Sequence, residues 1–267
     1  MPGSVEAGNP PEPAAEPPAA ILVADEVCKR FEDLTAVSPT SIRVAEGKIV
    51  GLVGSDGAGK TTLLRMCATM LKPTSGHIRV GGLDVVDQRR RVKDLIGYMP
   101  QRFGLYQDLT VSENLDFFMD VFGITGTERV DRRERYLGFS NLLPFVNRKA
   151  GDLSGGMKQK LGLACVLVHQ PRLLILDEPT NGVDPVSRAE FWEILAEMKQ
   201  AQMTVLVSTA YLDEGEKCDR LILMHASSVL VEASPATLLV GYADLEQAMI
   251  DHIQRFDPRL TEEKFGH

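Results

Sequence analysis

The sequence has no long apolar run, few cysteines and no excess of basic charge. No apolar stretch approaches the roughly 18 residues that a membrane-spanning helix needs, and the first residues lack the basic and apolar regions of a signal peptide. The four cysteines lie far apart and form no CxxC pair, which is typical of buried thiols in a reducing compartment. We therefore expect a cytoplasmic chain that serves a membrane, if at all, as a peripheral subunit.

The charge balance argues against a nucleic-acid partner. The formal net charge of -8 disfavours nonspecific binding to a polyanion by the surface as a whole. Two basic clusters remain, at residues 89–91 and 129–135. Both alternate with acids or lie in polar, helix-like sequence, so solvated helix faces are the preferred interpretation and a local basic patch is the alternative.

Length and composition indicate the domain organisation. With 267 residues and 44% hydrophobic content, the chain has room for one large α/β domain or two small ones, and we favour one domain with a subdomain. Residues 1–19 are dominated by proline, alanine and glutamate, which predicts a disordered tail. The main domain is predicted at residues 20–241, with a helical subdomain at about 102–165 and a C-terminal helical extension at 242–267.

A glycine-rich segment between two apolar runs predicts a phosphate-binding P-loop. Residues 49–53 are typical of a buried strand, and residues 63–70 have the apolar spacing of a helix. The P-loop between them consists of Gly54, Ser55, Asp56, Gly57, Ala58, Gly59, Lys60, Thr61 and Thr62. Its glycines let successive backbone N–H groups converge on phosphate oxygens, and the helix adds its positive dipole end. We expect Lys60 to reach the β- and γ-phosphates and the Thr61 hydroxyl to ligate Mg²⁺.

Two carboxylates follow a second apolar strand. Residues 173–176 are continuously apolar and end in Asp177 and Glu178, as expected where a parallel strand faces a ligand. Asp177 is placed to hold Mg²⁺ through water, and Glu178 to act as general base on the attacking water. Apolar strands that alternate with helices predict a mostly parallel sheet, and shorter runs at 21–23, 41–44 and 77–80 predict a small antiparallel sheet beside it.

A second anion-binding segment precedes another predicted helix. Ser154 is a candidate N-cap, and Gly155 and Gly156 follow it at the start of that helix; an ordinary capped helix is the alternative. Asp184 is a further N-cap candidate, since a proline follows it. Phe31, in the antiparallel region, has two interpretations: it stacks on a purine face, or it is a core aromatic.

Taken in chain order, these motifs resemble the nucleotide-binding subunit of ABC transporters over about residues 21–241. The resemblance rests on the P-loop, Gln101, the segment 153–156 and the segment 175–179. It implies an α/β fold: a P-loop NTPase core, which is a mostly parallel sheet with flanking helices, plus a small antiparallel β subdomain and a helical subdomain. The helical subdomain carries the signature segment, which consists of Ser154, Gly155 and Gly156. ATP and Mg²⁺ are the implied ligands.

The same resemblance implies roles for individual residues. Phe31 matches the aromatic that stacks on adenine, and Gln101 matches the loop glutamine that senses Mg²⁺ and water. The signature segment contacts ATP on a partner subunit, and Asp184 matches the aspartate of the D-loop. Two such subunits pair head to tail, each P-loop closing on the other's signature segment, so either a homodimer or a heterodimer with a second ABC ATPase is expected.

Several details resemble the ABC-2 exporter group. Met157 stands where the family commonly has glutamine, and the segments 99–106 and 208–214 are similar to ATPases of drug-efflux systems. Ala210 stands where histidine is normal, and alanine cannot hydrogen-bond the γ-phosphate or hold the attacking water. We therefore expect slow hydrolysis at the chain's own site, unless the hydroxyl of Tyr211 takes that place.

The leading hypothesis is an ATPase subunit, peripheral on the cytoplasmic face of the inner membrane, that powers export through a separate ABC-2-type permease. Residues 103–106 are expected to contact a permease helix, with core packing as the alternative. Two other functions stay open. One is a low-turnover regulatory ABC module, which Ala210 favours. The other is a non-transport ABC ATPase acting on ribosomes or DNA, although such proteins usually carry two ATPase modules or a coiled-coil insert, and neither is visible here.

Overall fold

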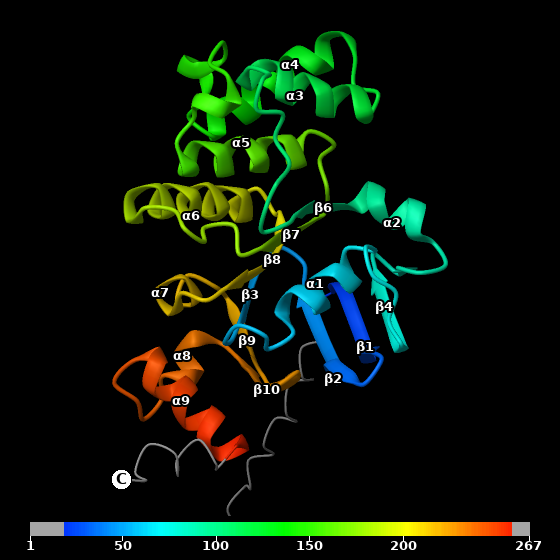
Figure 1. Cartoon of the computed structure of the whole chain (residues 1–267), viewed down its shortest axis with the longest axis vertical. Coiled ribbons are helices and arrows are strands. Elements are labelled where there is room, and N and C mark those ends of the chain that lie inside the picture. The colour runs from blue at the N-terminus through cyan, green and yellow to red at the C-terminus, as the bar shows by residue number, and fades with distance from the viewer. Residues whose placement is uncertain (1–18, 258–267) are drawn as a thin grey trace, which may run out of the picture.

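The chain folds around two sheets, as the computed structural model of residues 19–257 describes (Figure 1). The predicted tail, apart from its last residue, and the final ten residues of the predicted C-terminal extension lie outside the described residues. The first sheet is antiparallel, with strand order β2-β1-β4-β5. Its strands are β1 (Ala20–Phe31), β2 (Leu34–Ala45), β4 (Ser75–Val80) and β5 (Leu83–Asp84). This sheet confirms the predicted antiparallel unit, although β1 and β2 run further than the short apolar runs indicate, with register shifts between them.

The second sheet is parallel except at one edge. Its order is β10-β9-β3-β8-β7-β6, and only β10 pairs antiparallel, with β9. The strands are β3 (Ile49–Val53), β6 (Ile96–Met99), β7 (Leu173–Asp177), β8 (Thr204–Thr209), β9 (Arg220–His225) and β10 (Ser228–Ala233). Strands β3, β7 and β8 are buried along their whole length, which explains their continuous apolar sequence.

Both faces of the parallel sheet are covered, so alternate residues of one strand belong to different cores. In β3, Ile49 and Val53 pack with the helical subdomain and α6 (Pro185–Gln200). Val50 and Leu52 pack instead with α1 (Lys60–Cys67) and the antiparallel sheet. The P-loop therefore lies at the carboxyl edge of a central strand that is fixed from both sides.

The helices between β6 and β7 span the described residues 111–167, in the region where we predict a helical subdomain at about 102–165. This region contains α3 (Val111–Val121), α4 (Gly126–Phe139), the 3-10 turns η1 (Leu143–Phe145) and η2 (Ala150–Asp152), and α5 (Gly155–Leu167). Thr110 caps α3 in a reciprocal pair of hydrogen bonds with Glu113. In Figure 1 this subdomain lies above α6, at the far end of the molecule from the C-terminal helices.

The remaining helices are short or peripheral. They are α2 (Arg89–Leu95), α7 (Leu212–Gly215), α8 (Pro235–Leu238) and α9 (Leu245–Phe256). The helix α9 lies within the predicted C-terminal extension. Among residues 19–257, no helix is long and apolar enough to cross a membrane.

Three of the four arginines of α4 form ion pairs in this fold. Arg129 contacts Asp116 on α3 at 3.1 Å, and Arg133 pairs with the same carboxylate. Arg132 pairs with Glu128 and also donates to the carbonyl that follows α5. These contacts tie α4 to its neighbours, so this cluster is neither a free basic patch nor simply a solvated face.

Candidate functional site

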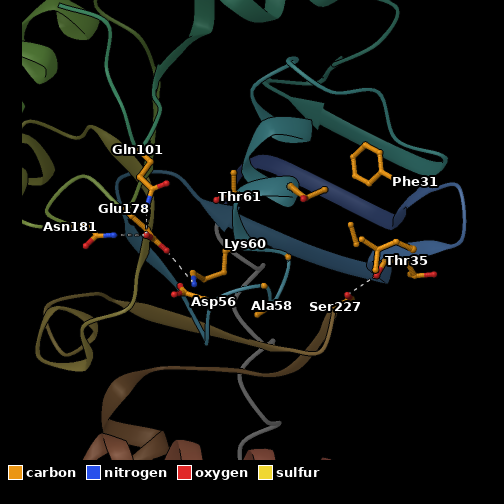
Figure 2. Close-up of a pocket in the computed structure, with 15 residues that line it drawn as sticks. Phe31, Thr35, Asp56, Ala58, Lys60, Thr61, Gln101, Glu178, Asn181 and Ser227 are labelled. Atoms are coloured by element: carbon orange, nitrogen blue, oxygen red, sulfur yellow. Dashed lines mark hydrogen bonds and ion pairs between the residues drawn. The ribbon is translucent and has the colours of Figure 1, made fainter.

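A cavity of about 500 Å³ opens where the P-loop meets the antiparallel sheet and the end of β7 (Figure 2). Most of the predicted nucleotide-site residues line it. The lining residues are Phe31, Leu34, Thr35, Ala36, Asp56, Gly57, Ala58, Gly59, Lys60, Thr61, Thr62, Gln101, Glu178, Asn181 and Ser227. The structure therefore gathers residues from β1, β2, the P-loop and three distant loops around one space.

The P-loop turns in a way that only glycine allows at two positions. Gly54 has φ 151°, and a Cβ there would lie 2.1 Å from the carbonyl oxygen of Met224. Gly59 has φ 102°, and a Cβ would lie 2.4 Å from the carbonyl oxygen of Ala36. The chain can thus pass close to neighbouring backbone and start α1 at Lys60, which directs the helix N-terminus toward the cavity.

Lys60 is buried but fully engaged. Its side chain is only 4% exposed, and Nζ donates to the carbonyl oxygens of Gly54 at 2.8 Å and Ser55 at 3.2 Å. It also lies 3.3 Å from Oε1 of Glu178. An ammonium group held by its own loop and one carboxylate is preorganised to receive anionic oxygens.

Three side chains converge on the Glu178 carboxylate, as the dashed lines in Figure 2 trace. Lys60 contacts Oε1, while Gln101 Nε2 and Asn181 Nδ2 donate to Oε2 at 3.0 and 3.1 Å. Glu178 itself has φ 47°, a left-handed conformation that is rare for a side chain of this kind. Its N–H donates to Ser208 Oγ at 2.9 Å, which anchors the strained residue to β8.

Asp177 offers a fitting place for a magnesium ion. Thr61 Oγ1 and Ser208 Oγ donate to its Oδ1 at 2.9 and 3.0 Å. Its other oxygen, Oδ2, is buried and has no hydrogen-bond partner among the described residues. Because the Thr61 hydroxyl donates its hydrogen to Asp177, the lone pairs of Thr61 Oγ1 stay free to bind a cation. Hydroxyl and carboxylate oxygens are hard ligands, which Mg²⁺ prefers.

Phe31 is not a core aromatic. Its side chain is 44% exposed and forms part of the cavity wall with Leu34 and Thr35, at the β1–β2 turn. Lys29 Nζ lies 4.8 Å from the centroid of the ring. The exposed ring of Phe31 therefore gives the cavity a flat apolar surface that a nucleotide base could cover.

The signature segment lies outside this cavity. Ser154 caps α5 by accepting a hydrogen bond from Met157 N at 3.3 Å. A Cβ at Gly156 would lie 2.3 Å from Cβ of Ser187, so this glycine lets α5 approach α6. A Cβ at Gly155 would meet nothing within 4 Å. The chain therefore has two separate helix starts of the anion-binding type, and only the P-loop one faces the cavity.

Asp184 and Ala210 also lie outside the cavity wall. Asp184 caps α6 by accepting from Ser187 N at 3.0 Å, and this hydrogen bond lowers the pKa of the Asp184 carboxyl. Ala210 is an exposed residue directly after β8. The next ring, Tyr211, lies under the guanidinium of Arg188, whose Cζ is 3.8 Å from the ring centroid.

A fully buried carboxylate joins these outlying segments. Glu214, which is 1% exposed, accepts from Thr180 Oγ1 at 2.7 Å and Arg188 Nε at 3.2 Å, and also from Thr209. Thr180 lies two residues after Glu178, Thr209 is the last residue of β8, and Arg188 belongs to α6. Glu214 therefore fixes three segments around the end of the parallel sheet.

The loop after Gln101 separates two aromatics that the sequence groups together. Phe103 packs on Phe118, with ring centroids 5.4 Å apart, and joins the core. Tyr106 is 46% exposed and lies edge-on to Phe117 at 4.6 Å. Buried Asn114 holds this loop by accepting from Tyr106 N at 2.9 Å and donating to three loop carbonyls. Core packing is therefore the right interpretation for Phe103. The prediction of a contact with a permease helix now rests on Tyr106.

Asn181, Leu34 and Thr35 are cavity residues that sequence reasoning missed. Asn181 had a usable signal, because it is an amide three residues after a candidate general base at a strand end. Leu34 and Thr35 had none, since they reach the cavity only through the packing of the antiparallel sheet against the P-loop.

Comparison with known proteins agrees with this geometry. A family model described as ABC transporter matches residues 37–181. The chain is 35% identical over 224 residues to the ABC transporter ATP-binding protein NatA of Bacillus subtilis, across 82% of this chain and 91% of that protein. It is 38% identical over 216 residues to the Nod factor export ATP-binding protein I of Rhizobium etli, across 80% and 68%.

A longer relative matches over part of its length. The chain is 48% identical over 221 residues to the probable multidrug ABC transporter ATP-binding protein YbhF of Escherichia coli, across 82% of this chain. It spans only 38% of that protein's length.

Solved structures share the fold. An ATP-binding subunit of an ABC transporter superposes with a TM-score of 0.78 at 25% identity, across 87% of this chain and 99% of that one. A dimeric ATP-binding cassette in a post-hydrolysis state, bound to ADP and Pi, superposes with a TM-score of 0.72 at 25% identity, across 80% and 98%. On the family match, the relatives and the P-loop site together, the chain belongs to the ATP-binding family of ABC transporters.

Proposed function

We propose that this chain binds ATP with Mg²⁺, hydrolyses the ATP, and thereby energises export through a separate ABC-2-type membrane permease. The observation that carries the proposal is that Lys60, Gln101 and Asn181 all contact the Glu178 carboxylate beside the P-loop. The hydrogen-bonded pair of Thr61 and Asp177 lies next to them. A cation for phosphate, a base for water and the Thr61 hydroxyl for a metal then line one cavity, and Asp177 lies directly behind Thr61.

The P-loop side of the cavity binds the triphosphate. Backbone N–H groups of the loop and the start of α1 hold the phosphates, and Lys60 meets the β- and γ-phosphate oxygens as a point charge. Phe31 stacks on the adenine. Thr61 and Asp177, with Gln101, would hold Mg²⁺, which when bound would neutralise charge on the phosphate oxygens.

Glu178 acts on the attacking water. Once Lys60 engages phosphate, the carboxylate is free of its cation and accepts a proton from a water aligned with the γ-phosphate. Gln101 and Asn181 keep hold of Oε2 and so orient the carboxylate toward that water. Ala210 offers no polar contact to the same water, so we infer slow turnover at the chain's own P-loop.

Dimerisation supplies the rest of the site. Ser154, Gly155 and Gly156 lie outside the chain's own cavity, which supports a head-to-tail pair in which they complete the partner's nucleotide site. ATP binding closes the pair and hydrolysis reopens it. The partner is a second copy of this chain or a different ABC ATPase, and the pair works at the cytoplasmic face of the inner membrane.

Export is supported by the names of two relatives, one described as a multidrug ABC transporter ATP-binding protein and one as a Nod factor export protein. Met157 and the segments 99–106 and 208–214 add the resemblance to ABC-2 exporters. A low-turnover regulatory module is the second candidate, because Ala210 leaves the site without one catalytic side chain. Single-turnover assays with and without a second ATPase separate these two functions.

The hydrolysis step is tested with Glu178→Gln. We expect this variant to keep MgATP binding and to lose turnover by roughly 10²- to 10⁴-fold, the usual contribution of a general base. Glu216→Gln, the same change at an exposed position, is the matched control and should leave both properties unchanged. Normal turnover in Glu178→Gln would place the base elsewhere.

The binding step is tested with Lys60→Ala. Removing this ammonium takes away the one buried side-chain cation that faces the phosphates in the described cavity, so tight MgATP binding should be lost. Isothermal titration calorimetry measures the affinity. Unchanged affinity would contradict the assignment of the cavity to nucleotide.

A further inference from the structure

Two amides grip the same carboxylate oxygen in this site. Oε2 of Glu178 accepts from Gln101 Nε2 at 3.0 Å and from Asn181 Nδ2 at 3.1 Å. A carboxylate oxygen has two lone pairs, so these two donors satisfy Oε2 and fix the rotation of the carboxylate plane. Among the described residues, only Lys60 joins them as a side-chain partner of this carboxylate.

The two amides differ in how firmly they are tied to Glu178. Gln101 is an exposed residue on the loop between β6 and α3. Asn181 lies three residues after Glu178, and its own N–H also donates to the Glu178 carbonyl oxygen at 3.2 Å. Asn181 therefore touches Glu178 through backbone and side chain, and the short turn between them keeps the amide at a fixed distance.

The neighbouring polar side chains are occupied elsewhere. The Ser208 hydroxyl donates a hydrogen bond to Asp177 and accepts one from the backbone N–H of Glu178. The Thr209 hydroxyl donates to the buried Glu214 carboxylate. Ala210, which follows them, has only a methyl group. The task of orienting the carboxylate thus falls to the two amides once Lys60 moves to phosphate.

We propose that Asn181 is a positioning residue that holds the Glu178 carboxylate in its reactive orientation. This inference rests on the proposed function, in which Glu178 is the general base. Asn181 makes no contact with the reacting atoms in this account. It acts through Glu178, so its loss should lower kcat and leave the binding of ATP largely intact.

The test compares Asn181→Ala and Asn181→Asp in the full-length protein. In Asn181→Ala we expect kcat at saturating MgATP to fall about 10- to 100-fold, since a misplacement of about 1 Å can cost up to about 10²-fold. The KM for ATP should change by no more than about threefold, the pattern of an interaction that matters mainly in the transition state. Asn181→Asp should be worse than Asn181→Ala, because it removes the donor and adds a like charge beside Glu178.

That order distinguishes a donor from a spacer. Asp has nearly the same shape as Asn, so a purely steric role predicts that Asn181→Asp retains more activity than Asn181→Ala. Asn141→Asp makes the same charge change at an exposed position in the helical subdomain, outside the cavity wall, and should leave kcat unchanged. Thermal unfolding of each variant separates lost activity from lost fold, because Asn181 is exposed and its substitutions should leave the midpoint unchanged.

Crystal structures of the wild type and Asn181→Ala, each with a bound non-hydrolysable ATP analogue, give a readout that does not depend on turnover, because Lys60 then contacts phosphate and no longer holds the carboxylate. The carboxylate of Glu178 should rotate or lose its single orientation in the variant. An unmoved carboxylate, wild-type kcat in Asn181→Ala, or a milder effect of Asn181→Asp overturns the proposal. Retained turnover in Glu178→Gln would instead overturn the assigned base, so the two failures are distinguishable.

Discussion

Ala210 places a methyl group directly after β8, at the position where the sequence resemblance leads us to expect an imidazole. We predict that Ala210→His raises the steady-state ATPase rate of the purified chain. The loss of one polar contact to a reacting oxyanion costs roughly 2.7 to 4 kcal/mol, so restoring one can raise turnover by up to about 10²- to 10³-fold. Phosphate release at saturating MgATP measures the change.

The neighbouring tyrosine supplies the control for this experiment. The ring of Tyr211 is stacked under Arg188, which argues against a role for its hydroxyl at the γ-phosphate. Tyr211→Phe should therefore keep the wild-type rate, alone and combined with Ala210→His. If the wild type hydrolyses ATP fast and Tyr211→Phe loses that activity, Ala210 does not slow the site. The Tyr211 hydroxyl would then make the polar contact that we expect from a histidine at position 210.

At the level of elements, the two signature glycines should separate folding from function. Gly156→Ala places a Cβ 2.3 Å from Cβ of Ser187, so α5 and α6 must move apart, at a cost of about 1–3 kcal/mol in the free energy of unfolding. Gly155→Ala meets nothing within 4 Å in this chain, and alanine is the better helix former, so the fold should be unchanged or slightly more stable.

Chemical denaturation of the two variants measures that difference, and an ATP-induced dimerisation assay follows it. We expect Gly155→Ala to weaken the dimer despite its stable fold, because the proposed head-to-tail pair puts the partner's nucleotide beside Gly155. A stable Gly155→Ala variant with wild-type dimerisation and turnover would remove this glycine from the proposed interface.

The loop after Gln101 leads to a second contrast between neighbouring residues. Phe103→Ala removes a partly buried ring that packs on Phe118 against the core, so it should lower the free energy of unfolding by about 1–3 kcal/mol. Tyr106→Ala removes an exposed ring and should leave the fold intact. If Tyr106 contacts the permease, co-purification with it from solubilised membranes should fall in Tyr106→Ala alone. Retained co-purification would remove Tyr106 from that interface.

This loop also illustrates how far the sequence could be interpreted. The sequence alone predicts the P-loop, Asp177 and Glu178. The spacing of glycines and the end of an apolar strand are local patterns, and each of them is typical of a single structure. Phe103 and Tyr106 lie in an irregular loop without periodicity, so nothing in their spacing says which one is buried. The strand β10 was missed because its hairpin turns at Ala226 and Ser227, both at positive φ, without the glycine or asparagine that normally marks such a turn.

Considered as a whole molecule, the chain keeps its thiols out of reach. All four cysteines are free and buried, and burial raises the pKa of both Cys67 and Cys218 to about 12. Burial likewise raises the pKa of Cys165. Because only the thiolate is reactive, we expect negligible labelling by a disulfide reagent between pH 7 and pH 9 in the folded state, and four thiols per chain after unfolding.

The pH dependence has a definite sign. In the unfolded chain Cys67 and Cys218 ionise near the ordinary thiol pKa of 9.0, whereas in the folded protein these two thiols keep their protons until about pH 12. Their contribution to stability is therefore complete below pH 9 and declines as the pH rises toward 12. Fast labelling of any thiol in the native protein at pH 8 would contradict the closed packing.

The ion pair between Lys60 and Glu178 makes the protein its own competitor for phosphate. In the nucleotide-free chain the carboxylate lies 3.3 Å from the ammonium, tethered at high effective concentration, and every incoming nucleotide must displace it. The measured affinity is thus a net quantity, lowered by the strength of an internal ligand. Glu178→Gln removes the negative charge of this internal ligand and so weakens its contact with Lys60 in the nucleotide-free chain. We therefore expect the variant to bind even ADP more tightly than the wild type, because less free energy is needed to release Lys60 for the phosphates.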